Sequence, residues 1–314
     1  MLLFFLSCWV VNCSTDQQLA DSQNLAKVGS KSAASMAAYY ESLADMVSRQ
    51  PELEIFYQAI NPALPKLAQT DFDLLDQQRA ALQRRTQLAR DLQGFYEALQ
   101  KLTAYKTGEN VGKAVDNLTN SLTLITNEPP RLFGVDLSVT LTPVISSIVG
   151  WKQSRDSKQA IVAMQITLNG LERLVNSEKD IYNRIILDRY FTLLNGNVNG
   201  GTKGIASYLL TSQSVTIDFL LQQLPELQAL PWSTGPVQDA VIKTAMQRVL
   251  ANHLSALETK AKGTAQNVAD SLQELTIEHQ KLLDGRPLTL ATVLGYQGQV
   301  QDYIDLWRKF RPKK

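Results

Sequence analysis

Apolar residues recur at intervals of three and four along most of the chain, which is the spacing of one face of an α-helix. This apolar stripe runs through residues 75–102, residues 161–185 and residues 242–282. At 1.5 Å per residue, the third run makes a helix of about 60 Å. Its apolar positions repeat every 3.6 residues or so rather than every 3.5, which favours a nearly straight rod over a tight supercoil.

Helix starts and stops separate these runs. Pro143 and Pro236 each suit the first turn of a helix, where the missing N–H costs nothing. Residues 127–130 (NEPP) and 284–287 (DGRP) predict helix ends, and residues 195–201 (NGNVNGG) predict a turn between helices. The sequence therefore predicts an all-α fold, an elongated antiparallel bundle of long helices joined by short turns.

One segment has a different pattern. Residues 135–151 (VDLSVTLTPVISSIVGW) carry a single charge, and their first half alternates strictly between apolar and polar positions. This alternation predicts a strand or extended arm, followed by an apolar helical turn over residues 143–150. An apolar tongue between long helices is similar to the membrane-inserting element of α-helical pore-forming toxins. The other interpretation is a buried segment packed across the bundle. The resemblance implies membrane contact by Val135, Leu137, Val139, Leu141, Ile145, Ile148 and Trp151.

Composition narrows the class of protein. With 44% hydrophobic and 19% charged residues, the chain is too apolar to be disordered. Its 31 basic and 30 acidic side chains give a net charge of +1, which excludes the broad basic field of a nucleic-acid binder.

The C-terminus is locally basic. It suits contact with an anionic lipid surface, or equally a helix end whose dipole favours positive charge. The residues concerned are Trp307, Arg308, Lys309, Phe310 and Arg311.

Both cysteines, Cys8 and Cys13, lie within the first thirteen residues. Cys8 lies inside the apolar run MLLFFLSCWVV, and Cys13 follows it. This run is too short to cross a hydrocarbon layer of about 30 Å as a helix. Its length is typical of the apolar core of a signal peptide. We therefore expect the protein to be exported.

The residues around Cys13 resemble the processing site of bacterial lipoproteins. Val10-Val11-Asn12-Cys13 is followed by small polar residues beginning with Ser14. The resemblance implies that the leader is removed before Cys13, that Cys13 carries the lipid, and that Ser14 directs the protein to the outer membrane. Cys8, after Phe5-Leu6-Ser7, is the alternative anchor. An ordinary cleaved signal peptide and a buried N-terminal helix are the alternatives to a lipid anchor.

The two histidines offer little chemistry. His253 and His279 are separated by about 39 Å and 80° on one predicted helix, so they cannot share a site. His279 lies on the apolar stripe between Leu275 and Leu282, which favours a hydrogen-bonded core histidine. Since the body has no cysteine, we expect no Cys–His catalytic pair, no metal and no cofactor.

Two further clusters have simple structural interpretations. Asp71, Asp73 and Asp76 begin a predicted helix, where carboxylates cap free N–H groups and suit the helix dipole; a calcium or acid–base site is the alternative. In the glycine-rich residues 196–204, Thr202 precedes Lys203, which is the wrong order for a phosphate loop. We interpret this segment as a turn between helices.

These observations predict a signal peptide over residues 1–12, a lipidated cysteine and polar tether over residues 13–35, and a single elongated helical bundle domain over residues 36–314. We expect a non-enzymatic lipoprotein, anchored on the periplasmic face of the outer membrane, that binds or scaffolds an envelope protein. No small-molecule substrate is evident. The alternative is a membrane-active bundle whose residues 135–151 insert into a bilayer.

Overall fold

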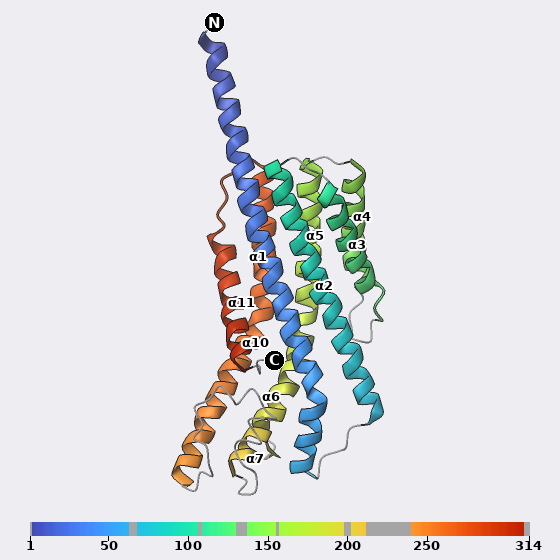
Figure 1. Ribbon diagram of the computed structural model, residues 1–314, viewed down its shortest axis with the longest axis vertical. Helices are drawn as coiled ribbons and strands as arrows, with labels where there is room; N and C mark the ends of the chain where they lie inside the picture. The colour runs from blue at the N-terminus through green and yellow to red at the C-terminus, as the bar shows by residue number, and fades with distance from the viewer. Residues whose placement is uncertain are drawn as a thin grey trace. The chain divides into compact units, whose positions relative to one another are not determined.

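The fold is all-α, as the sequence predicts. A computed structural model describes residues 2–62, 68–105, 109–129, 137–154, 157–197, 202–211 and 240–310 (Figure 1). Its helices are α1 (Leu2–Ile60), α2 (Gln69–Tyr105), α3 (Glu109–Thr126), α4 (Ser138–Ser154), α5 (Ser157–Ile181), the π-helix η2 (Tyr182–Leu187), α6 (Asp188–Asn195), α7 (Ile205–Thr211), α10 (Ala240–Leu283) and α11 (Ala291–Phe310).

The three periodic runs are confirmed as long helices. Residues 75–102 lie in α2, residues 161–185 lie in α5 and the start of η2, and residues 242–282 lie in α10. The predicted helix ends are also confirmed. After α10, Gly285 has φ of 66°, and the Arg286 N–H donates to the Lys281 carbonyl at 2.8 Å. This bond closes the helix in the way that a C-terminal glycine allows.

The predicted strand at the start of residues 135–151 is wrong, because α4 begins at Ser138. Pro143 consequently lies inside α4 rather than in its first turn, while Val135 and Pro236 lie outside the described residues. The apolar residues fit both periods: they alternate up to residue 141, and they also follow helical spacing through residue 151. The helical set is the buried one, formed by Leu137, Leu141, Val144, Ile148 and Trp151.

The predicted turn after α6 contains a very short hairpin. Strands β1 (Gly196–Asn197) and β2 (Thr202–Lys203) pair antiparallel, with Gly196 opposite Lys203. Gly196 has φ of 83°, a conformation that glycine adopts without strain. The segment therefore connects α6 to α7 as a turn between helices.

The chain forms two compact units, to which the long helices contribute different parts. Unit 1 consists of residues 1–38, 83–178 and 266–299, and unit 2 of residues 39–82, 179–265 and 300–314. Unit 1 thus includes residues that the sequence assigns to a polar tether. These residues are helical, and Leu25 and Ala33 are buried, so the packed part of the chain begins well before residue 36.

In unit 1, α2 and α3 run antiparallel. Arg84 at one level pairs with Glu128, which follows α3, whereas Asp91 further along α2 accepts a hydrogen bond from Ser121, which is earlier in the chain. Helix α1 approaches α2 so closely at Gly29 that a Cβ there would overlap the ring of Tyr96. Polar contacts join α1 to α10 and α11. They are Ser32 Oγ to Ser271 Oγ at 2.9 Å, Gln297 Nε2 to the Val28 carbonyl at 2.9 Å, and Gln297 Nε2 to Ser32 Oγ.

Unit 2 has an aromatic core. The ring centroids of neighbouring side chains lie 5.5–6.5 Å apart, mostly edge to face, which is a favourable arrangement for aromatic pairs. The rings belong to Tyr39, Tyr40, Tyr182, Tyr190, Phe191, Tyr303 and Trp307.

Candidate functional site

The proposed anchor, Cys13, lies on α1, which is continuous from Leu2 to Ile60. The beginning of α1 extends past the ends of the other helices of unit 1 (Figure 1). Along the described side chains of α1, Gln17, Leu19 and Ala20 are exposed, and the first buried residue is Leu25. The cysteine therefore lies on a helical segment that precedes the packed part of unit 1.

The residues of α4 that the sequence assigns to membrane contact are divided between the two sides of the helix. Leu137, directly before α4, and Leu141, Ile148 and Trp151 within it are buried, and the ring of Trp151 packs edge-on against Phe95 of α2 at 5.4 Å. Val139 is 77% exposed and Ile145 is partly exposed. Only these two of the named α4 residues reach the surface, so lipid contact by the whole set requires α4 to leave unit 1.

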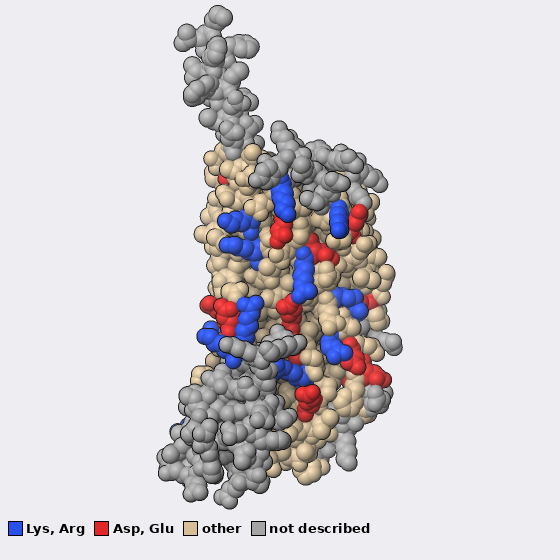
Figure 2. Space-filling model, viewed as in Figure 1, with Lys and Arg blue, Asp and Glu red and all other residues tan. Residues whose placement is uncertain are grey.

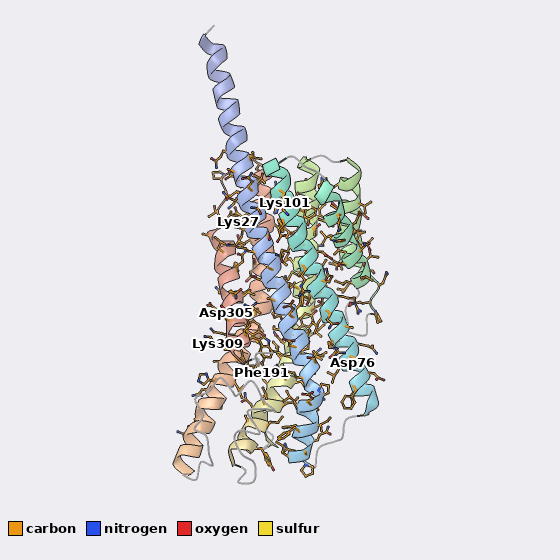
Figure 3. The ribbon with its side chains drawn as sticks, viewed as in Figure 1. Lys27, Asp76, Lys101, Phe191, Asp305 and Lys309 are labelled. Atoms are coloured by element: carbon orange, nitrogen blue, oxygen red, sulfur yellow. The ribbon has the colours of Figure 1, made fainter. Side chains whose placement is uncertain are left out.

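Of the C-terminal residues that the lipid-contact interpretation names, Trp307 does not lie on the surface. Trp307 is buried, and its ring lies 5.9 Å from that of Tyr190. Arg308 and Lys309 are exposed near the end of α11, where Figure 3 labels Asp305 and Lys309. Arg308 lies 3.5 Å from the Asp305 carboxylate. The Phe310 side chain and Arg311 lie outside the described residues.

His279 is a buried, hydrogen-bonded core residue, as its place on the stripe predicts. Its Nε2 lies 3.0 Å from the hydroxyl of Tyr96, so α10 and α2 are joined at this point. Burial lowers the pKa of His279 to about 3 and raises the pKa of the Tyr96 hydroxyl. Both groups are neutral at physiological pH. His253 is exposed on the same helix, far along its axis.

Of the three aspartates at the start of α2, Asp71 caps the helix. Asp71 accepts a hydrogen bond from the Ala68 N–H at 2.8 Å, and Asp76 pairs with Arg79 at 3.0 Å. Such a carboxylate in the first turn satisfies an otherwise free N–H group. Within the described part of the chain, no three His, Cys, Asp or Glu residues are grouped so that they could hold a metal ion.

Unit 1 contains a buried ion cluster that the apolar pattern of the sequence does not predict. Arg85 is fully buried; its Nε lies 2.9 Å from Glu178 Oε2 and its Nη1 lies 2.8 Å from Glu128 Oε2. Arg84 also pairs with Glu128, so two arginines face two carboxylates. A signal was present in the sequence: Arg85 and Glu178 occupy stripe positions, Arg85 between Leu82 and Ala89.

The described surface carries both signs of charge. In Figure 2, Lys and Arg are interspersed with Asp and Glu over the visible face, in keeping with the net charge of +1. None of the described helices combines the length and the apolar character needed to cross a bilayer.

Comparisons with protein-family models, with curated proteins and with solved structures each found no match to this chain.

Proposed function

We propose that the protein is an exported lipoprotein, anchored through Cys13, whose helical body binds a protein of the cell envelope without catalysing a reaction. The observation that carries the proposal is the placement of both cysteines in a signal-like leader, with Cys13 in a sequence that resembles a lipoprotein processing site. Acyl chains on one cysteine provide stable attachment, because each buried methylene contributes about 0.8 kcal/mol.

The chemistry of the body is consistent with a binding role. The Arg85 guanidinium, its two carboxylate partners and the His279 imidazole are buried, and each is used in joining helices. Within the described ranges, the exposed faces of long helices are surfaces available to other molecules. Such faces provide the lateral area that a protein–protein interface of about 1,600 Å² requires.

Labelling with a palmitate analogue tests the anchor. Expressed in a bacterium that processes lipoproteins, the full chain should incorporate the label, and Cys13→Ala should abolish it. Cys8→Ala is the matched control, since it changes the other leader thiol and should leave labelling intact. Loss of label in Cys8→Ala alone moves the anchor to Cys8, and absence of label in the unchanged chain contradicts the lipoprotein proposal.

Envelope binding is tested by photo-crosslinking from exposed positions on the helices. A photoreactive residue at Leu294, which is exposed on α11, should give a discrete crosslinked species in envelope preparations, and that species should diminish when unlabelled protein competes. Crosslinks that do not respond to competition contradict specific binding. The same residue at buried Val300 is the control for background reactivity.

A second candidate, membrane insertion by α4, is favoured by one observation. Residues 138–151 contain no charged side chain, and Val139 presents an isopropyl group directly to solvent. In this candidate α4 leaves unit 1 and exposes its buried face to lipid. The protein should then release dye from liposomes, and Val139→Asp together with Ile145→Asp should reduce the release. Val162→Asp, at an exposed position on α5, is the control; failure of the unchanged protein to release dye contradicts this candidate.

A further inference from the structure

The segment between the proposed anchor and the packed part of unit 1 is helical. Helix α1 runs without interruption through residues 13–25, so the axial distance from Cys13 to Leu25 is about 18 Å at 1.5 Å per residue. The start of α1 lies beyond the other helices of its unit (Figure 1), and Gln17, Leu19 and Ala20 are exposed, so tertiary packing holds the helix only from about residue 21 onward.

This segment contains no residue that strongly breaks a helix. Residues 13–28 contain neither glycine nor proline, whereas flexible linkers are rich in glycine and serine. The Gln17 side chain donates to the Asp21 carboxylate at 3.0 Å, a pair at the i, i+4 spacing that stabilises isolated helices.

Removal of the leader leaves a suitable helix start. The new N-terminal sequence is Cys13-Ser14-Thr15-Asp16-Gln17, in which Ser14 and Gln17 have the spacing of a capping box. Asp16 falls in the first turn, where a negative charge suits the helix dipole. The processed chain is therefore expected to keep its helix up to the acylated residue.

We propose that residues 14–24 form a rigid stalk, which holds unit 1 at a fixed distance and orientation from the membrane anchor. This inference rests on the proposed function, since it requires acylation of Cys13. Such a stalk has one length and one direction, whereas a flexible polar tether samples many. A partner of unit 1 must then lie within a narrow range of distance from the lipid surface, and the rotation of α1 determines which faces of unit 1 it meets.

The width of a distance distribution distinguishes a stalk from a tether. A flexible coil of twelve residues has a root-mean-square length of about 19 Å, nearly the length of the helix. The mean distance is therefore uninformative, whereas a coil samples a broad range of lengths and a helix does not.

Spin-label distance measurements on the acylated full-length product in lipid vesicles provide the test. Labels at Leu19→Cys on the stalk and Ile277→Cys on α10, both exposed positions in unit 1, report the geometry. Leader removal eliminates Cys8, and acylation blocks Cys13, so only the introduced thiols react. We expect a narrow distribution.

Two insertions after Ser22 serve as a matched pair. Seven alanines add two turns, so they should shift the distribution by up to about 10 Å and leave it narrow. Seven Gly and Ser residues should broaden it severalfold. A distribution in the uninserted protein as broad as in the Gly/Ser variant overturns the stalk. Palmitate labelling of each sample is checked first, so failed acylation counts against the lipoprotein proposal and a broad distribution in acylated protein counts against the stalk.

Discussion

Unit 1 and unit 2 share the long helices of the chain, but the contacts that join the helices differ. Among the described residues, unit 1 relies on buried polar contacts: the Arg85 ion cluster, the pair of Tyr96 and His279, and the seam of Ser32, Ser271 and Gln297. Unit 2 has a cluster of tilted and edge-on aromatic rings, among them Tyr40, Tyr182 and Tyr190, beside a few buried polar contacts such as that of Gln50 with the Ile186 carbonyl.

The difference has consequences for specificity. A buried donor must meet its acceptor within about 0.5 Å and a limited angle, so polar contacts fix the register between helices. Aromatic rings tolerate a range of tilts at similar energy. Unit 1 is therefore expected to be the more sensitive to single substitutions that remove one partner, and it is the unit that carries the proposed anchor.

The largest expected effect is at Arg85. Arg85→Met leaves Glu178 buried without its cation, so we expect a loss of about 3–5 kcal/mol in the free energy of unfolding, measured in urea. The double variant Arg85→Met with Glu178→Leu should recover most of this loss, since no charge is stranded at Glu178. Arg79→Met breaks an exposed pair with Asp76 and should cost at most about 1 kcal/mol. An equal loss in both arginine variants contradicts the importance of burial.

Two helical glycines compare the units directly. Gly29→Ala should destabilise unit 1 by about 1–3 kcal/mol, because the new methyl group overlaps the ring of Tyr96, whose hydroxyl is held by His279. Gly263→Ala in unit 2 should stabilise by about 0.5–1 kcal/mol, since no atom lies within 4 Å of the added Cβ and alanine favours the helix. Urea unfolding of both variants should show opposite signs; equal signs would refute the close approach at Gly29.

The sequence was sufficient for the helices but not for all of their contacts. Periodicity identified α2 and α10 because their apolar stripes extend over many turns, and Gly285 marked the end of α10. It failed at α4, where the same residues satisfy alternation over a few positions and helical spacing over more. The pattern that extends over more residues decides between a strand and a helix, and here the helical pattern extends further.

Tertiary partners were less predictable. His279 was recognised as a core residue because it interrupts an apolar stripe, but nothing in local spacing indicates that Tyr96 lies opposite. Arg85 and Glu178 interrupt stripes in the same way, yet the pairing of two stripes depends on which helices become neighbours. That choice is made by the whole fold. Of the candidate site, the sequence pattern singles out Cys13 and predicts a tether that grades into a helix, but it does not predict that the helix already includes the residues directly after Cys13.

The pair of His279 and Tyr96 should make unit 1 sensitive to acid. The pKa of His279 is about 3 in the folded state and about 6.5 in the unfolded state, so the unfolded state binds more protons between these values. Stability should therefore fall as the pH decreases from 6.5 toward 3, by at most about 1.4 kcal/mol for each pH unit. His279→Gln should remove this contribution. The comparison is made by urea unfolding at pH 7 and pH 5, and an unchanged pH dependence in the variant would contradict the assignment.

Removing one hydroxyl from each unit gives the finest comparison. Tyr303→Phe deletes the hydroxyl that lies 2.9 Å from Ser42 Oγ, but Ser42 keeps its hydrogen bond to the Tyr39 carbonyl at 2.6 Å. Because no buried group loses its last partner, the loss should be about 1 kcal/mol or less. Tyr96→Phe in unit 1 removes the hydroxyl that lies 3.0 Å from His279 Nε2, and His279 Nδ1 has no hydrogen-bond partner among the described residues, so a buried ring is left unsatisfied. We expect the Tyr96 variant to lose about 1 kcal/mol more than the Tyr303 variant in urea unfolding. Equal losses would mean that the contact of Tyr96 with His279 in unit 1 is no more demanding than that of Tyr303 with Ser42 in unit 2.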